Sequence, residues 1–207
     1  MPERLLGLLG GTFDPVHIGH LRTAMDLKQA LNLSEVRLIP NHAPPHRTKP
    51  VLSGELRIAL LEKAVKDIPG VAADDTELMR QGTSYMVDTL RSLKQQFPQK
   101  HLCLIIGTDA YNSFCEWHDW KGILQLAHLL VMNRAGAGEI NNPETDHLIT
   151  TDVNSLLQVE SGLVFLQSVS QLDVSSTRIR RMIKQHQSIE FLVPENIRIE
   201  IENLYKG

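Results

Sequence analysis

The sequence predicts a doubly wound α/β fold, in which a mostly parallel β-sheet is covered by helices on both faces. Apolar runs at residues 5–9 and 102–106 are typical of buried strands, because strands covered on both faces need no polar alternation. Segments in which apolar residues recur at helical spacing lie between such runs. This alternation favours parallel strands joined by right-handed helical crossovers.

Six segments have the length and composition of strands. The run at residues 102–106 is apolar throughout and should lie in the centre of the sheet. Acidic residues (Asp74, Asp75 and Glu77) favour an edge position for the third segment. The predicted strands span residues 5–9, 35–39, 71–79, 102–106, 128–132 and 163–166.

Helices are predicted where apolar periodicity meets a suitable start and stop. Ser53 is a good N-cap, and Pro69 and Gly70 end the helix that follows it. The polar stretch at residues 135–150 has no periodicity, and three prolines make residues 41–50 a loop. The predicted helices span residues 18–31, 53–69, 82–97, 121–127, 155–159, 175–186 and 194–205.

Length and composition limit the class of protein. With 207 residues, 42% of them hydrophobic and 22% charged, the chain fits one domain (residues 1–207) with a helical C-terminal part at about 170–207. A net charge of −3 argues against a general nucleic-acid binder. The only two cysteines, Cys103 and Cys115, predict neither a disulfide framework nor a cysteine zinc site. No run is long enough to span a membrane and no leader is recognisable, so we expect a cytoplasmic protein.

Residues 5–21 predict a phosphate site where a strand turns into a helix. Gly10 and Gly11 let the backbone approach a ligand, because no Cβ stands in the way. Pro15 fixes a turn before the helix begins near Ile18. The N–H groups and the positive dipole end of that helix attract anions.

Three interpretations compete for His17 and His20, which are three residues apart and share one helix face. They could bind a metal ion, but carboxylate or thiol partners at a matching spacing are missing nearby. They could be structural residues that cap a turn. Contacts to nucleotide phosphates are the interpretation we favour, and the other two stay open at this point.

Two further basic segments are candidates for the same site. The loops at residues 10–20, 40–49 and 107–117 follow strand ends, where ligands bind in doubly wound sheets. The second loop carries His42, His46, Arg47 and Lys49, although a solvated basic loop is the plainer interpretation.

The helix start at residue 175 is the other basic candidate. Ser175 or Ser176 is a good N-cap, and the following N–H groups can hold phosphate. Arg178 and Arg181 share one face and could supply bidentate contacts. From composition alone, a solvated helix with surface arginines is an equal alternative.

The block G-G-T-F-D-P-V-H-I-G-H at residues 10–20 resembles the signature of the nucleotidyltransferase superfamily with its H-x-G-H motif. S-S-T-R-I-R at residues 175–180 resembles the second motif, S-S-T-x-I-R, which holds the triphosphate in that superfamily. Asp173 and Val174 depart slightly from it, since an isoleucine often precedes the serines. Within the superfamily, the chain is most similar to the nicotinate-nucleotide adenylyltransferases. That resemblance covers nearly the whole chain and includes residues 40–41, 44–47, 84–85, 106–109, Trp117 and Arg134.

The resemblance implies a Rossmann-like nucleotidyltransferase fold with C-terminal helices. It further implies adenylyl transfer from ATP to nicotinate mononucleotide, with Mg²⁺ accompanying ATP and no metal ligands on the protein. His17, His20 and Arg178 would be catalytic, Asp109 would bond a ribose hydroxyl and Arg134 would lie beside the adenine. The residues implied for ATP binding are Gly10, Gly11, Thr12, Phe13, His17, His20, Arg47, Arg134, Ser176, Thr177 and Arg178. Those implied for mononucleotide binding are Asn41, Ser84, Tyr85, Met86, Gly107, Asp109 and Trp117.

A preference for the acid over the amide can also be argued from the residues. Ser84, Tyr85 and Met86 begin a predicted helix, whose amides favour a carboxylate over a neutral carboxamide. Trp117 offers a face on which a cationic pyridinium can stack, worth about 0.5–2 kcal/mol. Trp117 also fits an ordinary core position, because aromatic residues cluster there.

The expected chemistry needs positioning and charge neutralisation rather than a strong base, because the 5′-phosphate of the mononucleotide is already anionic. We expect direct in-line attack on the α-phosphorus without a covalent enzyme intermediate. One alternative is a sister nucleotidyltransferase that uses nicotinamide mononucleotide or pantetheine phosphate, and the other is a non-catalytic nucleotide-binding module. The sequence leaves open whether the protein is a monomer or a homodimer.

Overall fold

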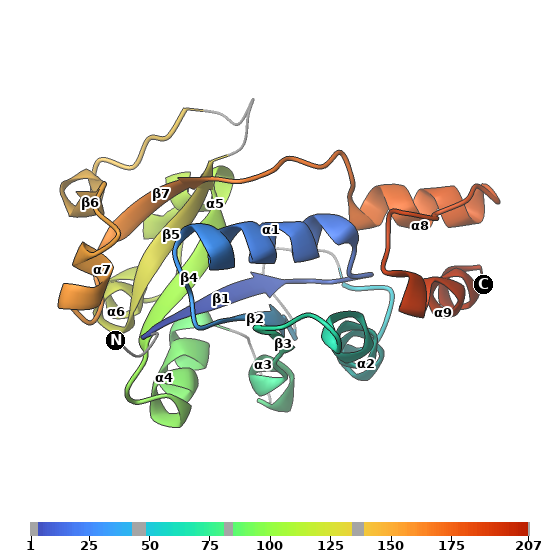
Figure 1. Cartoon of the computed structure of the whole chain (residues 1–207), viewed down its shortest axis with the longest axis horizontal. Coiled ribbons are helices and arrows are strands. Elements are labelled where there is room, and N and C mark those ends of the chain that lie inside the picture. The colour runs from blue at the N-terminus through green and yellow to red at the C-terminus, as the bar shows by residue number, and fades with distance from the viewer. Residues whose placement is uncertain (1–3, 43–48, 81–84, 134–138, 207) are drawn as a thin grey trace.

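The computed structural model describes residues 4–42, 49–80, 85–133 and 139–206, within which the chain forms a seven-stranded sheet of order β3-β2-β1-β4-β5-β7-β6 (Figure 1). Each neighbouring pair of these strands is parallel, so the predicted doubly wound α/β fold is confirmed and the described sheet has no antiparallel member. The strands are β1 (Leu5–Gly11), β2 (Glu35–Pro40), β3 (Val71–Ala73), β4 (His101–Gly107), β5 (Ala127–Asn133), β6 (Ile149–Thr150) and β7 (Val164–Ser168).

The direction in which strands are added to the sheet reverses beside β1. The chain first adds β2 and β3 on one side of β1 and then crosses over to place β4 on the other side. Ligands of doubly wound sheets bind at such a switch point, outside the carboxyl ends of the strands. The ends of β1 and β4 therefore position the site.

Helices cover both faces of the sheet. Helices α1, α2, α8 and α9 contribute buried residues to one hydrophobic cluster, and α4, α5 and α6 to the cluster on the opposite face. The described helical segments are α1 (Ile18–Ala30), α2 (Gly54–Val65), α3 (Thr76–Met79), α4 (Met86–Gln96), α5 (Thr108–Asn112), η1 (Phe114–Glu116), α6 (Trp120–Leu126), η2 (Asp146–Leu148), α7 (Ser155–Gln158), α8 (Ser176–Lys184) and α9 (Glu195–Tyr205).

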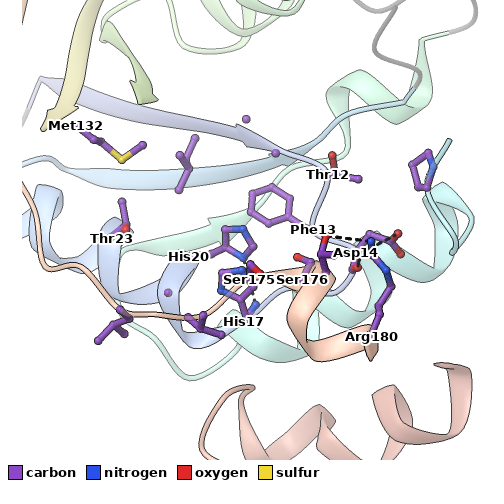
Figure 2. A pocket seen from close by; sticks show the side chains of 18 of the residues that line it. Thr12, Phe13, Asp14, His17, His20, Thr23, Met132, Ser175, Ser176 and Arg180 are labelled. Carbon is purple, nitrogen blue, oxygen red and sulfur yellow. Dashed lines mark hydrogen bonds and ion pairs between the residues drawn. The ribbon is translucent and has the colours of Figure 1, made fainter. Parts of the chain in front are cut away.

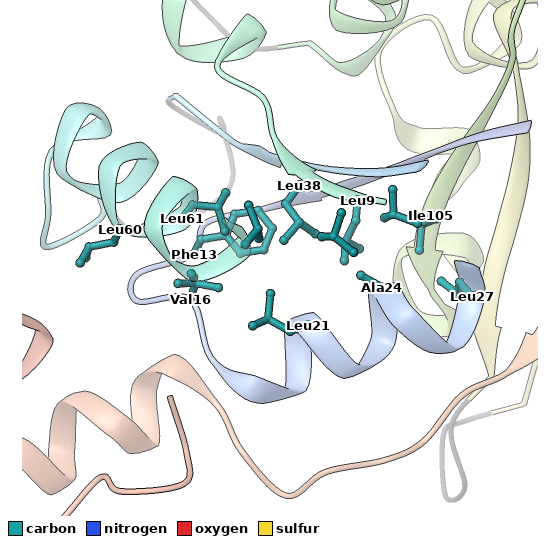
Figure 3. Close-up of a cluster of buried hydrophobic side chains, with 14 of the residues drawn as sticks. Leu9, Phe13, Val16, Leu21, Ala24, Leu27, Leu38, Leu60, Leu61 and Ile105 are labelled. Carbon is teal, nitrogen blue, oxygen red and sulfur yellow. The ribbon is translucent and has the colours of Figure 1, made fainter. Parts of the chain in front are cut away.

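Helix α1 shows why its sequence forms an amphipathic helix at this place. Leu21, Ala24 and Leu27 recur three residues apart and belong to the buried cluster beneath the sheet (Figure 3). In the sheet, Leu9 and Ile105 stand opposite each other in the register of β1 and β4 and belong to the same cluster. Burial of a leucine of this kind contributes about 1.5–3 kcal/mol, so the first turn of α1 is held firmly at the end of β1.

The strand predicted over residues 71–79 is wrong in its second half. Strand β3 has only three residues and lies at the edge, as its acidic residues indicated, while α3 occupies Thr76–Met79. The buried Asp74 carboxylate accepts a hydrogen bond from the backbone N–H of Thr76 (2.9 Å) and pairs with Arg37 of β2 (2.8 Å). This local side-chain bond turns the chain out of the strand, which periodicity alone does not reveal.

Two segments predicted as loops contain regular structure. The segment after β4 forms α5 and η1, so the 107–117 loop is mostly helical. Within residues 139–150, η2 is followed by β6, whose two residues pair with β7. Such short elements depend on neighbours distant in the sequence and leave no periodic pattern.

The C-terminal helices pack against the first half of the chain. Helix α9 lies beside α2, where the Asn196 side chain donates to the carbonyl of Lys63 (2.7 Å). The segment between α8 and α9 reaches the start of α1, since the Ile18 N–H donates to the Leu192 carbonyl (3.0 Å). Among the described residues, no helix is long and apolar enough to cross a membrane.

Candidate active site

The turn between β1 and α1 forms the floor of a cleft. Phe13 adopts a left-handed backbone conformation (φ 48°) and its side chain is buried. A Cβ added to Gly11 would lie 2.9 Å from the Phe13 ring, closer than side chains tolerate. Glycine at this position therefore allows Phe13 to fold back under the turn, which leaves the backbone facing the cleft.

His17 and His20 lie together at the start of α1, as their spacing predicted. His17 is the N-cap residue, and its ring stacks on that of His20 with centroids 3.6 Å apart (Figure 2). The His17 backbone N–H donates to Nδ1 of His20 (3.2 Å). Because Nδ1 accepts, the ring proton of His20 resides on Nε2, which makes that atom a donor.

An alternative interpretation of His17 and His20 is a metal site, which would need further ligating side chains nearby. Among the described residues, no three histidine, cysteine, aspartate or glutamate side chains are grouped so that they could hold a metal ion. Within the part of the chain that the structure describes, Asp14 is the one acidic residue that lines the cleft, and its carboxylate oxygens accept bonds from Val51, Leu52 and Tyr205.

The N-terminus of α8 forms the second wall of the cleft. Ser175 is its N-cap, and the hydroxyl accepts from the backbone N–H of Arg178 (3.2 Å). The Ser176 hydroxyl donates to the Pro15 carbonyl (2.9 Å) and so fastens α8 to the β1–α1 turn. Two helix N-termini, of α1 and α8, thus meet at one cleft, and both attract anions.

The cleft has a volume of about 550 Å³ and is built from four stretches of chain. They are the β1–α1 region, a segment before α2, the end of β5, and the connection from β7 into α8. Its lining includes Gly10, Gly11, Thr12, Phe13, Asp14, His17, His20, Lys49, Val51, Met132, Ser175, Ser176, Thr177 and Arg180. The structure thus brings the two sequence motifs together on one cavity.

Arg180, rather than Arg178, is the arginine of α8 that lines this cleft. Arg180 Nη1 donates to the Asp14 carbonyl and Nη2 to the Thr177 hydroxyl (3.3 Å), as Figure 2 shows for Asp14. Arg178 instead points to Asp173, with Nη1 2.7 Å from the Asp173 carboxylate. Arg180 occupies the final arginine position of S-S-T-x-I-R, so the motif itself carried the signal that would have identified it. A catalytic role for the Arg178 side chain stays a prediction.

Arg57 is a second residue that sequence reasoning missed. Its guanidinium is buried, with Nη1 donating to the Thr12 carbonyl and Nη2 to the Asn41 carbonyl, both at 2.8 Å. Burial lowers the pKa of Arg57, and the nearby Asp14 carboxylate opposes that shift. Arg57 therefore ties the end of β1 to the end of β2. The available signal was that Arg57 stands three and four positions before Leu60 and Leu61, on the buried apolar face of α2.

Three of the residues predicted for the mononucleotide, Tyr85, Met86 and Trp117, pack against the hydrophobic cluster on the face of the sheet opposite α1. Tyr85 is the N-cap of α4 and stacks on His118 at 4.1 Å, next to Trp117. The Trp117 ring is half-buried against Phe114 (5.7 Å), so it is partly a core residue, as its alternative interpretation proposed.

Three further predicted positions lie near the switch point. The Met86 side chain reaches the end of β1, because a Cβ on Gly10 would lie 3.3 Å from its terminal carbon. Asp109 is exposed in the first turn of α5, two residues after Gly107. The Asn41 side chain donates to the Thr12 hydroxyl (3.4 Å), and its buried oxygen has no hydrogen-bond partner among the described residues.

Several predicted positions lie outside the described residues. They are His46 and Arg47 of the basic loop, Ser84 before α4, and Arg134 after β5. Their contacts to ATP or mononucleotide stay predictions.

Comparison with known proteins gives consistent matches over the whole chain. Residues 8–182 match a family model described as cytidylyltransferase-like. A protein of Psychromonas ingrahamii named "Probable nicotinate-nucleotide adenylyltransferase" is 38% identical over 210 residues, covering 99% of this chain and 98% of the relative. A protein of the same name from Chromohalobacter salexigens is 41% identical over 202 residues, covering 95% and 92%.

Solved structures of similar fold include nicotinic acid mononucleotide adenylyltransferase of Plasmodium falciparum. Its complex with NaAD superposes with a TM-score of 0.67 at 18% identity, covering 98% of this chain and 97% of that one. Its complex with APC gives 0.65 at 19% identity, with the same coverage. At 18% and 19% sequence identity, this similarity supports the fold alone.

Proposed function

The chain belongs to the cytidylyltransferase-like family, among relatives named nicotinate-nucleotide adenylyltransferases, and from this premise we propose that it transfers the adenylyl group of ATP to nicotinate mononucleotide. The products are deamido-NAD and pyrophosphate, which makes the protein a nucleotidyltransferase of NAD biosynthesis. The cleft at which β1, α1 and the N-terminus of α8 meet is the observation that carries this proposal.

The reaction forms one bond and breaks one at the α-phosphorus. An oxygen of the mononucleotide 5′-phosphate attacks this phosphorus, and the bond to the oxygen that bridges the α- and β-phosphates breaks. The electron pair leaves with pyrophosphate, in line with the incoming oxygen and without a covalent enzyme intermediate. No strong base is needed, because the attacking phosphate is already ionised.

Charge is the main obstacle to this reaction. Two unit negative charges about 4 Å apart repel by roughly 4 kcal/mol at an effective dielectric constant near 20. The cleft supplies the opposing donors: Nε2 of His20, the guanidinium of Arg180 and the N–H groups at the start of α8. These groups are held by bonds to the protein before any ligand binds, so little reorganisation is needed when charge moves onto pyrophosphate.

Mg²⁺ belongs to this proposal as part of the MgATP substrate. Divalent magnesium commonly binds through substrate phosphates, and the described residues offer no carboxylate cage for it. The Asp14 carboxylate already accepts bonds from Val51, Leu52 and Tyr205, which also favours magnesium binding through the substrate phosphates. When bound, the ion would neutralise phosphate charge, while the protein's own groups orient the triphosphate.

The proposed preference for the acid rests on the N-terminus of α4 and on Trp117. The N-terminus of α4, capped by Tyr85, favours a carboxylate, and Trp117 offers a ring face to a cationic pyridinium. Met86, which follows Tyr85 in the sequence, reaches the end of β1. A cytoplasmic location is also part of the proposal and rests on the sequence alone.

The direct test is pyrophosphate release from MgATP with separate acceptors. We expect rapid release with nicotinate mononucleotide, a product of the mass of deamido-NAD, and much slower release with nicotinamide mononucleotide. Equal rates with the two mononucleotides would refute the proposed acid preference. Pyrophosphate release only with pantetheine phosphate would show that the protein is a sister nucleotidyltransferase with that acceptor. ATP binding without pyrophosphate release for any acceptor would identify a non-catalytic nucleotide-binding module.

A further inference from the structure

One buried carboxylate joins segments of the cleft that are far apart in the sequence. Asp14 is only 3% exposed. Its Oδ2 accepts from the backbone N–H of Val51 (2.8 Å), and its Oδ1 accepts from the N–H of Leu52 (3.2 Å). Asp14 therefore holds the segment that enters α2, of which Val51 lines the cleft.

The same residue holds α8. Arg180 Nη1 donates to the main-chain carbonyl of Asp14 and lies 3.7 Å from its carboxylate oxygen Oδ2. A charge on Asp14 in a fixed orientation therefore helps to set the position of the Arg180 guanidinium. Figure 2 shows the two side chains facing each other at the end of the cleft.

The last turn of the last helix supplies the remaining bond to this carboxylate. The Tyr205 hydroxyl donates to Asp14 Oδ1 at 2.5 Å, across 191 positions of sequence. Tyr205 is 3% exposed and its ring packs in the cluster that contains α2 and α8 residues. Burial, together with the neighbouring Asp14, raises the pKa of Tyr205, so the hydroxyl keeps its proton and acts as a donor.

We propose that Tyr205 is a positioning residue for the triphosphate cleft, acting through Asp14 on the Val51 segment and on Arg180. Tyr205 does not itself line the cleft in the described part of the chain, and its hydroxyl reaches the cleft by its bond to Asp14. With the hydroxyl present, Oδ1 is shared between Tyr205 and Leu52, and the carboxylate plane is defined by donors on both oxygens. Without it, Oδ1 keeps only the longer bond from Leu52 (3.2 Å), so the carboxylate is held less tightly in its orientation. This inference rests on the proposed function, since it assumes that the cleft binds ATP phosphates.

A purely structural role is the competing explanation, because any buried hydrogen bond adds stability. The chain offers a matched control in Tyr111, which is also buried (0% exposed) and whose hydroxyl bonds Thr145 at 2.7 Å. Tyr111 belongs to the opposite hydrophobic cluster and does not line the cleft. Tyr111→Phe and Tyr205→Phe each remove one buried hydroxyl bond, so a merely structural role would give them similar effects.

The experiment compares these two variants in steady-state kinetics and in melting temperature. For Tyr205→Phe we expect the KM for ATP to rise about three- to tenfold with kcat within about twofold, which corresponds to about 0.7–1.4 kcal/mol at 1.4 kcal/mol per factor of ten. For Tyr111→Phe we expect an unchanged KM for ATP. A Tyr205→Phe enzyme whose KM for ATP moves no more than that of Tyr111→Phe would overturn the proposal.

Asp14→Asn provides a second variant that does not depend on the folding of Tyr205→Phe. Asp14→Asn should raise the KM for ATP at least as much as Tyr205→Phe does. The double variant should have a KM for ATP close to that of Asp14→Asn alone, because both changes act through one carboxylate. Independent, additive effects would also refute the inference.

Binding of α,β-methylene-ATP, measured by calorimetry, separates this inference from the proposed function. If the wild-type protein releases no pyrophosphate with nicotinate mononucleotide, the proposed function fails. The ratio of dissociation constants for the analogue, Tyr205→Phe over wild type, still decides the inference: a ratio of about three or more supports it, and a ratio near one refutes it.

Discussion

Replacing Arg180 with methionine should lower kcat/KM for ATP by about tenfold or more, whereas the same change at Arg178 should lower it by less than about fivefold. The two residues lie two positions apart on α8, so their side chains leave the helix about 200° apart. Arg180 lines the cleft and is held by Asp14 and Thr177. Arg178 is 41% exposed and pairs with a fully exposed Asp173.

The magnitudes follow from these environments. A charge-assisted hydrogen bond to phosphate contributes about 1.5–3 kcal/mol, and each 1.36 kcal/mol is a factor of about ten in rate. Loss of one such bond at Arg180 therefore costs about 12- to 150-fold. An exposed ion pair such as that of Arg178 contributes only about 0–1 kcal/mol, mainly by holding the start of α8 in place.

The assay is pyrophosphate release at saturating nicotinate mononucleotide with ATP varied, for wild type, Arg178→Met, Arg180→Met and Arg180→Lys. Arg180→Lys should fall between wild type and Arg180→Met, because lysine keeps the charge but loses the forked geometry. Melting temperatures show whether each variant is folded. A loss at Arg178→Met as large as that at Arg180→Met would refute the reasoning and favour the catalytic role that the sequence suggested for Arg178.

Two further changes test other parts of the molecule. His20→Ala should lower kcat at least about tenfold in the same assay, because it removes one charge-assisted bond of about 1.5–3 kcal/mol made mainly in the transition state. A near wild-type kcat would show that His20 does not stabilise the transition state. Burial lowers the pKa of His128 to about 4 in the folded protein, whereas the unfolded value is about 6.5. Between these two pH values the unfolded chain binds a proton at His128 that the folded chain does not. The free energy of unfolding therefore falls as the pH falls from about 6.5 toward 4. In urea unfolding, wild type should lose about 2 kcal/mol more than His128→Gln between pH 7 and pH 5, and an equal loss in the two proteins would show that another group is responsible.

Long apolar patterns predicted the architecture well. Strand β4 and helix α1 lie where their periodicity placed them, because each buries a continuous apolar run or stripe in the core. The prediction failed at residues 71–79, where the bond from the Thr76 N–H to the Asp74 side chain ends the strand after Ala73. A single polar contact of this kind outweighs a weak β pattern.

The candidate site was predictable only in its local parts. Glycines at the end of β1, histidines at the start of α1 and serines at the start of α8 act through the backbone of their own turn, so their spacing is visible in the sequence. Arg57 and Tyr205 contact the site across 16 to 191 positions of sequence. Their types and local surroundings resemble those of ordinary helix residues, so no motif marks them.

The sequence by itself determined that a strand turns into a helix at a phosphate site and that a serine-capped helix provides a second one, because backbone geometry and helix dipoles depend on neighbouring residues. Only the tertiary structure decided that both meet at one cleft and that Arg180 faces it while Arg178 turns to Asp173. It also decided that Asp14 serves as the shared anchor for Val51, Leu52 and Tyr205. The physical reason is that the direction of a side chain is set by what packs against its helix, and in this fold the packing partners of α8 and α9 come from the opposite end of the chain.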